Sequence, residues 1–217
     1  MQKSKNTKIY FGITIITLCV ILFVVLAIFV KLGKVNALND WFYNTFAKPI
    51  QNNSLTNFFI VFTYLGNFFV LLIISMCFLF KKQKKDAVFL VLSLIFASIL
   101  TFLIKFIIKN PRPEDIMLID ESGFSFPSAH ATLSATTLTM IAYFLSKQTS
   151  KTWLKILIWS ISTILVLSVC YSRIYLGVHY LTDILAGLLL SAIIITIFIM
   201  LYNLKSLSLK IKTNKPN

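Results

Sequence analysis

The residues best able to do chemistry lie in three short stretches of an otherwise apolar chain, which read KFIIKNPRP, PSAH and SRIYLGVHYLTD. The residues concerned are Lys105, Arg112, Ser128, His130, Arg173, His179 and Asp183. Planar guanidinium groups match the geometry of phosphate oxygens. Imidazoles exchange protons near neutral pH. Together these side chains indicate chemistry on a phosphate-like anion.

The stretch from Pro127 to His130 is suited to the start of a helix. Ser128 is a good N-cap, because its hydroxyl can accept a hydrogen bond from a backbone amide that has no helical partner. The free amides of Ala129 and His130 would then point out of the positive end of the helix dipole, which favours an anion. The stretch therefore predicts a phosphate cradle with an imidazole beside it.

Asp183 follows His179 by four residues, a spacing that would place both side chains on one face of a helix. Asp183 could then accept the Nδ1 proton of His179 and leave Nε2 free. Such an imidazole could be a nucleophile, a general base or a metal ligand. A zinc or manganese site that includes Glu114 or Asp115 is one alternative. The three nearby cations argue against it, because they would repel a divalent ion.

The three stretches resemble the signature of the type-2 phosphatidic acid phosphatase superfamily. Lys105 to Pro113 matches Lys, six residues, Arg-Pro, and Ser172 to Asp183 matches Ser-Arg, five residues, His, three residues, Asp. Pro127 to His130 matches Pro-Ser-Gly-His, except that Ala129 stands in place of Gly. In the first turn of a helix φ is negative, so Ala costs little there and we expect activity to be retained. The resemblance extends over residues 58 to 202, most of the chain.

The resemblance implies a membrane lipid phosphatase that needs no metal or cofactor. His179 would attack phosphorus to form a phosphohistidine, Asp183 would orient it, and His130 would protonate the leaving oxygen and then help water to attack. The groups that would hold the phosphate oxygens are Lys105, Arg112, Ser128, Arg173 and the backbone near Ala129. Implied substrates are undecaprenyl diphosphate, phosphatidylglycerol phosphate and phosphatidic acid. The first is preferred, because its outward-facing pool would need recycling in a bacterial envelope.

Two other classes of protein fit parts of the pattern. A non-enzymatic anion transporter or channel could line its path with these cations. That class gives no reason for the pairing of His179 with Asp183, and no cation lies within an inner half-span to continue the path. A vanadate site of the superfamily's haloperoxidase branch would suit a soluble protein better than a chain of this composition.

Composition indicates that membrane helices position these residues. The chain has 217 residues, of which 58% are hydrophobic and 13% charged. Six apolar blocks are long enough to cross a bilayer, and the first is too long for a signal peptide. The expected spans are Ile9–Val30, Phe58–Phe80, Ala87–Ile108, Ala131–Leu145, Leu154–Tyr171 and Ile184–Tyr202. The fourth block is short, and its start is expected nearer Pro127. We predict one all-α, six-span domain over residues 1–217, with its catalytic motifs within 105–183.

The net charge of +14 is explained by topology. Lysines cluster at the N-terminus, in the loop KKQKKD, after the fourth block and in the tail, which six spans put on one face. Positively charged short loops stay cytoplasmic. Both termini are therefore expected on the cytoplasmic side of a plasma membrane, and the three motifs on its outer side. The expected partners are the membrane and a lipid phosphate, with no nucleic acid and no obligatory protein.

The first outer segment, ALNDWFYNTFAKPI, carries several aromatic residues on one helical face. Trp41, Phe42 and Phe46 at this spacing suit a short helix that lies in the headgroup layer. Packing of the same face against the bundle is the alternative. No chemistry is expected from this segment.

Overall fold

The computed structural model describes residues 2–80 and 84–213, and this part of the chain is helical with no strand. The helices are α1 (Gln2–Lys31), α2 (Asn36–Phe42), α3 (Asn53–Phe62), α4 (Phe68–Cys77), α5 (Lys84–Ile108), α6 (Ala129–Lys147), α7 (Thr152–Tyr175) and α8 (Leu181–Thr213). Short helical turns extend α2, α3 and α4, and one further turn, Glu114–Ile116, lies in the long loop after α5. The all-α class expected from composition is thus confirmed.

Within residues 2–80 and 84–213, four helices are long and apolar enough to cross a membrane. They contain the spans Ile9–Lys31, Lys84–Ile108, Thr152–Tyr175 and Leu181–Leu204. A fifth is counted if the bent pair Asn53–Gly66 and Phe68–Cys77 forms one span. The pair is bent by 55°, so the expected block Phe58–Phe80 is not one straight helix. The count of six spans therefore stays a prediction.

The fourth expected block is α6, which is less apolar than the others because it carries several hydroxyl side chains. Thr132, Ser134, Thr136 and Thr137 are all buried. Hydroxyls inside a bundle can bond to the helix backbone, as Ser134 does to the carbonyl of His130 at 2.6 Å. These residues face protein rather than lipid, which explains why the most central helix has the weakest membrane signal.

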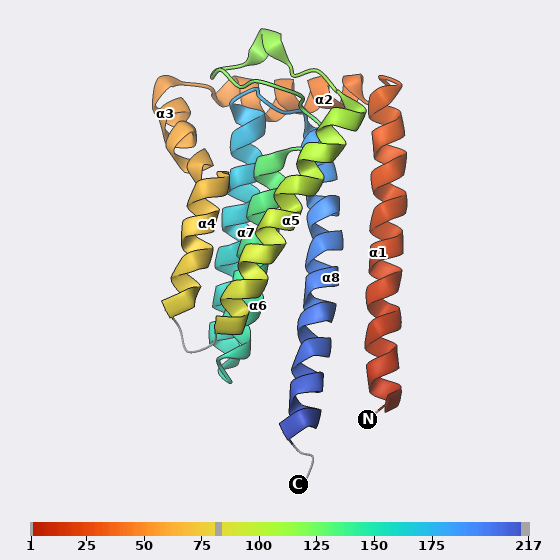
Figure 1. Cartoon of the computed structure of the whole chain (residues 1–217). Coiled ribbons are helices and arrows are strands. Elements are labelled where there is room, and N and C mark those ends of the chain that lie inside the picture. The colour runs from red at the N-terminus through yellow and green to blue at the C-terminus, as the bar shows by residue number, and fades with distance from the viewer. Residues whose placement is uncertain (1, 81–83, 214–217) are drawn as a thin grey trace.

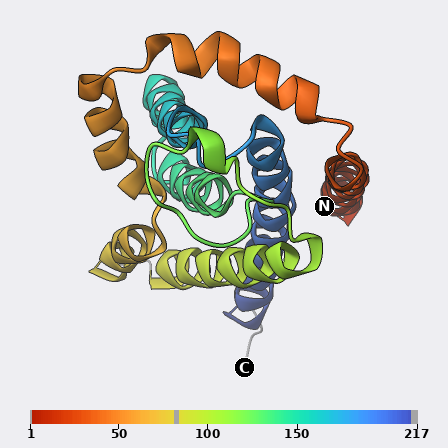
Figure 2. The same ribbon diagram turned by 90° about the horizontal axis from the view of Figure 1, so that it is seen from above.

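Helix α6 stands at the centre of the bundle, with α5, α7 and α8 around it (Figures 1 and 2). The largest buried cluster includes Leu71 of α4, Leu94 of α5, Met140 of α6 and Ile194 of α8. Helix α1 packs against α8 at the edge of the molecule. Close packing around α6 therefore determines where its first turn lies relative to the ends of its three neighbours.

Helix α2 runs across the end of the bundle, roughly perpendicular to α1, at the same end as the loop between α5 and α6 (Figures 1 and 2). The side chains of Trp41 and Phe46 are exposed, and Phe42 packs on the bundle. The buried amide of Asn39 bonds to both the hydroxyl and the backbone N–H of Thr182, at 3.1 and 3.2 Å. Asn39 thereby ties α2 to the start of α8. An interfacial position for α2 stays a prediction.

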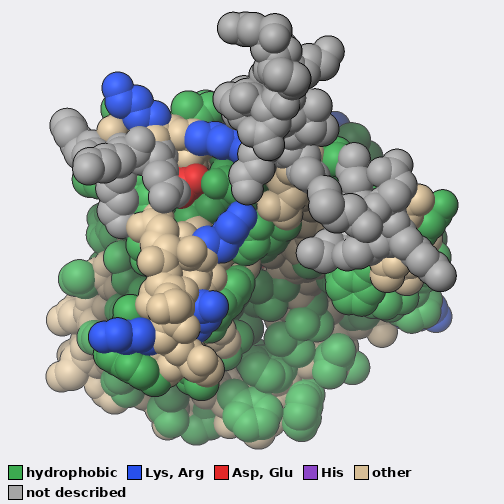
Figure 3. Space-filling model, turned by 90° about the horizontal axis from the view of Figure 1, so that it is seen from below, with side chains coloured by type: hydrophobic (Ala, Val, Ile, Leu, Met, Phe, Trp, Pro, Cys, Tyr) green, Lys and Arg blue, Asp and Glu red, His purple; other side chains and the backbone are tan. Residues whose placement is uncertain are grey.

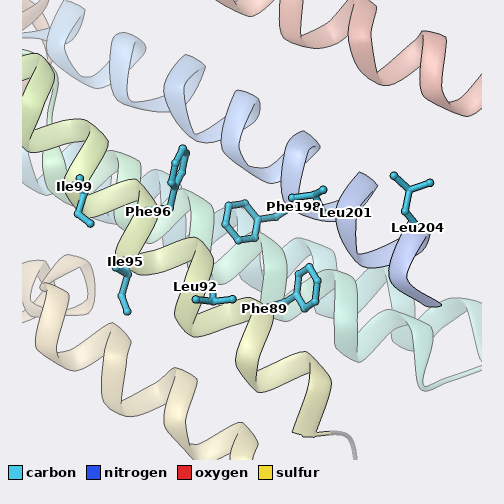
Figure 4. A pocket seen from close by; sticks show the side chains of 8 residues that line it. All are labelled: Phe89, Leu92, Ile95, Phe96, Ile99, Phe198, Leu201 and Leu204. Carbon is cyan, nitrogen blue, oxygen red and sulfur yellow. The ribbon is translucent and has the colours of Figure 1, made fainter. Parts of the chain in front are cut away.

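The end of the bundle opposite α2 carries lysine side chains, and an apolar groove lies between α5 and α8. Figure 3 shows positive side chains spread over this face. A groove of about 770 Å³ lies between α5 and α8 and is lined only by apolar side chains (Figure 4). Its lining residues are Phe89, Leu92, Ile95, Phe96, Ile99, Phe198, Leu201 and Leu204. The side of the bundle between α5 and α8 is therefore suited to contact with lipid chains.

Candidate functional site

The first turn of α6 has the geometry expected from its sequence. Ser128 precedes the helix, and its hydroxyl accepts a long hydrogen bond of 3.4 Å from the N–H of Ala131, so the N-cap prediction is confirmed. Ala129 is the first helical residue and is not among the residues with positive φ. Within the described residues, the backbone amides of Ala129 and His130 have no acceptor. Two free N–H groups at the end of a helix dipole can bind an anion.

His179 and Asp183 contact each other, but not on one helical face. His179 lies in the turn before α8, which begins at Leu181, so the expected helical placement is wrong. The Nδ1 of His179 is 3.2 Å from Oδ2 of Asp183, as the four-residue spacing predicts. Asp183 is fully buried in the first turn, where it also accepts a hydrogen bond of 2.9 Å from the N–H of Tyr180. The carboxylate therefore orients the imidazole from a capping position.

The other ring nitrogen of His179 faces a guanidinium group. Nη1 of Arg112 is 3.4 Å from Nε2 of His179. Because Asp183 accepts the proton of Nδ1, Nε2 carries the free electron pair. Burial lowers the pKa of His179 well below its ordinary value of 6.5, and the positive charges of Lys105 and the arginines lower it further. The lowered pKa favours a neutral imidazole, whose Nε2 faces the guanidinium group of Arg112.

Arg112 is held in place by backbone carbonyls. Its Nε donates to the carbonyl of Gly123 at 3.0 Å, its Nη1 to that of Val178 at 2.8 Å, and its Nη2 to that of Ser122 at 3.1 Å. Nη2 also lies 3.8 Å from the carboxylate of Glu121. Burial lowers the pKa of Arg112 from its ordinary value, but a guanidinium group stays charged in proteins. The loop around residues 121–123 therefore fixes the direction of this positive charge.

Arg173, at the end of α7, is almost fully buried. Its Nη1 donates to the hydroxyl of Thr63 at 3.0 Å, and its Nη2 pairs with the carboxylate of Glu121. Its Nε has no partner among the described residues. A buried donor without an acceptor is costly, so this nitrogen is ready to bind an anion.

Lys105 reaches the same region from the end of α5. Its Nζ donates to the carbonyl of Phe124 and, at 3.1 Å, to that of Ser125. The hydroxyl of Ser125 lies 3.4 Å from the carboxylate of Asp183. The loop between α5 and α6 thus links the lysine to the pair of His179 and Asp183.

His130 lies in the first turn of α6, against the break in the second apolar block. A Cβ added to Gly66 would be 2.9 Å from Cδ2 of His130 and 2.7 Å from a methyl group of Val169. The close approach of the Gly66 backbone therefore holds the imidazole on one side. No hydrogen bond to either ring nitrogen is present in the described part of the chain, so the ring is free to exchange a proton with a bound molecule.

All eight residues singled out from the sequence lie at the end of the bundle where the loop between α5 and α6 covers α6, α7 and α8 (Figure 1). Glu114 and Asp115 do not join them, because they form an exposed turn in that loop. Residues 2–80 and 84–213 contain no group of three or more histidine, cysteine or acidic side chains that fits a metal ion. The structure therefore gathers cations and imidazoles at this end.

Three further residues of this region were not singled out from the sequence. Ser125 and Thr63 are common polar residues whose partners are distant in sequence, so no local pattern marks them. Glu121 had a weak signal, since it is one of few acidic residues and shares a loop with Arg112. Its contact with both arginines is visible only in the fold.

Comparison with known proteins identifies a family whose model matches this chain. The model of the PAP2 superfamily matches residues 86–206. Phosphatidylglycerophosphatase B of Bacillus subtilis is 35% identical over 121 residues, which cover 54% of this chain and 59% of the relative, less than two thirds of its length. Undecaprenyl-diphosphatase of Sulfolobus acidocaldarius is 28% identical over 184 residues, which cover 79% of this chain and 84% of that protein.

Solved structures are similar over most of the chain. The crystal structure of a transmembrane PAP2 type phosphatidylglycerolphosphate phosphatase from Bacillus subtilis has a TM-score of 0.78 at 27% identity, covering 92% of this chain and 98% of that one. The structure of LpxE from Aquifex aeolicus has a TM-score of 0.63 at 28% identity, covering 75% and 94%. The helical arrangement described above is thus similar to that of a solved transmembrane phosphatase.

Proposed function

Because the chain belongs to the PAP2 superfamily, we propose that it is an integral membrane enzyme that hydrolyses a phosphate monoester or diphosphate of a lipid. Relatives named phosphatidylglycerophosphatase and undecaprenyl-diphosphatase support a lipid substrate. Undecaprenyl diphosphate is our preferred candidate, ahead of phosphatidylglycerol phosphate and phosphatidic acid. Its outward-facing pool needs a phosphatase to return it to use.

The observation that carries the proposal is the position of two side chains, those of Asp183 and Arg112, on opposite sides of the imidazole of His179. Asp183 binds Nδ1 of His179 at 3.2 Å, and Arg112 lies 3.4 Å from Nε2 on the other side of the ring. A phosphoryl group held by Arg112 would therefore meet the free electron pair of a neutral imidazole. An anion channel has no need of such an oriented nitrogen, whereas nucleophilic catalysis requires one.

In the first step Nε2 of His179 attacks phosphorus, and an N–P bond forms while the bond from phosphorus to the leaving oxygen breaks. His130 donates a proton to that oxygen, which leaves on the lipid alcohol or, for a diphosphate, on the lipid monophosphate. Asp183 stabilises the positive charge that develops on the imidazole of His179. The ring of His130 makes no hydrogen bond within the described structure, so its nitrogens are available to the leaving oxygen.

In the second step water attacks the phosphohistidine. His130, now neutral, takes a proton from the water as the new O–P bond forms and the N–P bond breaks. Inorganic phosphate leaves, and both imidazoles return to their starting protonation states. The same residue acts first as an acid and then as a base, as is usual when a covalent intermediate is formed and hydrolysed.

Stabilisation of the transferring phosphoryl group is assigned to fixed positive charges. Phosphoryl transfer depends mainly on positioning and on electrostatic stabilisation. Arg112, Arg173 and Lys105, together with Ser128 and the free amides near Ala129, provide these without a metal ion. We therefore propose metal-independent catalysis.

The decisive experiment measures phosphate release from the purified protein in detergent, with the three candidate lipids supplied separately and EDTA present. We expect release from at least one lipid, fastest from undecaprenyl diphosphate. His179→Asn should lower kcat by roughly 10⁴-fold or more, since a nucleophile has been removed. Rapid quenching with a ³²P-labelled lipid should trap a phosphoprotein that is stable in base and labile in acid.

Asp115→Asn is the matched control, because Asp115 is exposed and lies in the same loop as Arg112. It should retain the activity of the original chain. Normal turnover by His179→Asn would remove the proposed nucleophile. Loss of activity in EDTA that one divalent ion restores would instead support a metal-dependent hydrolase.

A further inference from the structure

We propose that the carboxylate of Glu121 occupies the position of the phosphoryl group between Arg112 and Arg173, and that substrate must displace it. The inference rests on the proposed function and deepens it, because it names a residue that sets the affinity for phosphate. Glu121 would then be an internal competitor rather than a catalytic residue.

Glu121 is paired with both arginines of the site. Its Oε2 contacts Nη2 of Arg173, and its Oε1 lies 3.8 Å from Nη2 of Arg112. Carboxylate and phosphate bind guanidinium groups with the same paired geometry. A phosphate held between these two arginines would need the place that the carboxylate now takes.

The carboxylate satisfies the site only in part. Nε of Arg173 has no partner in the described residues, although the side chain is 1% exposed. A carboxylate has two oxygens, whereas a phosphoryl group has three that do not bridge to the lipid. The additional oxygen gives phosphate a means of binding a donor that Glu121 leaves unmatched, which favours the exchange.

Glu121 is also better able to leave than the groups around it. Its side chain is 30% exposed and lies in a loop, whereas that of Arg173 is buried in α7. The neighbouring carbonyls of Ser122 and Gly123 bind Arg112 through the backbone, and their bonds do not depend on the carboxylate. A change of side-chain rotamer at Glu121 would therefore open the site while the loop stays in place.

Displacement has a measurable cost. Phosphate binds only to molecules in which Glu121 has left the arginines, so the observed affinity is reduced by the fraction of open molecules. A purely structural ion pair predicts the opposite effect. If Glu121 were needed to hold the arginines in position, its removal would weaken phosphate binding.

The test compares Glu121→Gln and Glu121→Asp with Asp120→Asn. Asp120 is exposed and has no contact with either arginine. Its substitution removes the same charge one residue away from Glu121. Inorganic phosphate is the probe. Its inhibition constant is measured against lipid hydrolysis, and its binding is measured independently from the rise in Tm that it causes.

We expect Glu121→Gln to strengthen phosphate binding about tenfold, in line with removal of a competing conformation. Glu121→Asp keeps the charge but shortens the side chain, so it should also strengthen binding, by a smaller factor. If only the loss of a negative charge strengthened phosphate binding, Glu121→Asp would bind phosphate as the original chain does. Asp120→Asn should bind phosphate as the original chain does.

Unchanged or weaker phosphate binding by Glu121→Gln would overturn the inference, and if that variant does not fold, the same result for Glu121→Asp decides. The two proposals fail separately. A chain that hydrolyses lipid phosphate but binds phosphate equally in all variants refutes the competitor alone. A chain that hydrolyses none of the lipids refutes the proposed function, while the Tm measurements still report on Glu121.

Discussion

The protonation state of His179 follows from its surroundings. Its pKa lies well below 6.5 because the ring is buried and because Lys105, Arg173 and Arg112 repel a proton. In the proposed mechanism the neutral form is the reactive one, and a lowered pKa keeps it populated at all pH values above that pKa. Activity that depends on neutral His179 is therefore lost only as the pH falls through a value below 6.5.

This state can be observed directly, since the chain has only two histidines. In His130→Gln, labelled with ¹³C-histidine, the remaining imidazole belongs to His179. We expect its resonance to stay that of a neutral ring as the pH is lowered to 6.5. The same variant unfolded in detergent should titrate near 6.5, the value of a free imidazole. A midpoint of 6.5 or higher in the folded protein would contradict the assignment of His179 as a neutral nucleophile.

At this scale the sequence predicted pairs that are close in the chain and missed those that are not. The contact of Asp183 with His179 spans four residues, so residue spacing was sufficient to predict it. The pairing of Glu121 with Arg173 spans 52 residues and depends on how the loop folds over α7. The local sequence around either residue does not predict a contact between Glu121 and Arg173.

Among the elements, the break in the second apolar block makes the clearest contribution to the geometry of the candidate site. The turn Thr63–Gly66 ends the first half, and the side chain of Asn67 caps α4 by accepting a hydrogen bond of 2.9 Å from the N–H of Phe69. Both helices then run at 55° to each other. The bend brings Thr63 to Arg173 and the Gly66 backbone to His130.

Gly66→Ala should therefore impair catalysis without removing any reacting group. The new methyl group would lie 2.9 Å from the imidazole of His130 and 2.7 Å from Val169, so His130 must move. We expect kcat/KM to fall roughly 10- to 100-fold, because small displacements of catalytic groups have effects of this size. Steady-state kinetics with the preferred lipid provides the measurement.

Gly12→Ala is the matched control, since its methyl group would meet only the flexible side chain of Met200 in α8. It should retain full activity. Equal activity of Gly66→Ala and Gly12→Ala would show that the bend does not position His130.

The bend was expected neither from hydropathy nor from composition, although its signals are present. Phe58–Phe80 is apolar enough on average to be counted as one block, but Gly66 and Asn67 within it have the residue types of a helix stop and an N-cap. The start of α6 was predicted more accurately, because Pro127 and Ser128 mark it in the same way and stand outside an apolar block. Hydropathy alone thus conceals turns inside membrane segments.

For the molecule as a whole, the distribution of lysines gives a testable orientation. The start of α5 at Lys84 and the start of α7 at Thr152 lie at the end of the bundle opposite the candidate site (Figure 1). The positive-inside rule then assigns the site to the outer face. We infer the orientation from charge, together with six spans and both termini in the cytoplasm.

Cysteine labelling of intact cells measures this orientation. In a variant without Cys19, Cys77 and Cys170, we expect a membrane-impermeant maleimide to label Glu114→Cys at once. Gln148→Cys, in the exposed connection between α6 and α7, should react only after the membrane is permeabilised. The reverse pattern would place the site in the cytoplasm.

The family could be predicted at this scale, because three motifs with matched spacing are highly specific. The number of membrane crossings could not. The hydroxyls of Thr132, Thr136 and Thr137 lower the hydropathy of α6, yet they are buried in protein. Hydropathy scores each side chain as if it faced lipid. It therefore underestimates how readily a helix spans the membrane when other helices surround it.

The oxygen atoms of residues 121–125 have a consequence for the end of each catalytic cycle. Carbonyl and carboxylate groups of this segment contact Lys105, Arg112 and Arg173. In the proposed reaction, these groups can replace the oxygens of inorganic phosphate one after another as it departs, so the cations are never left together without a counter-charge. Product release would then be an exchange of partners rather than a complete separation of charge, which would limit product inhibition.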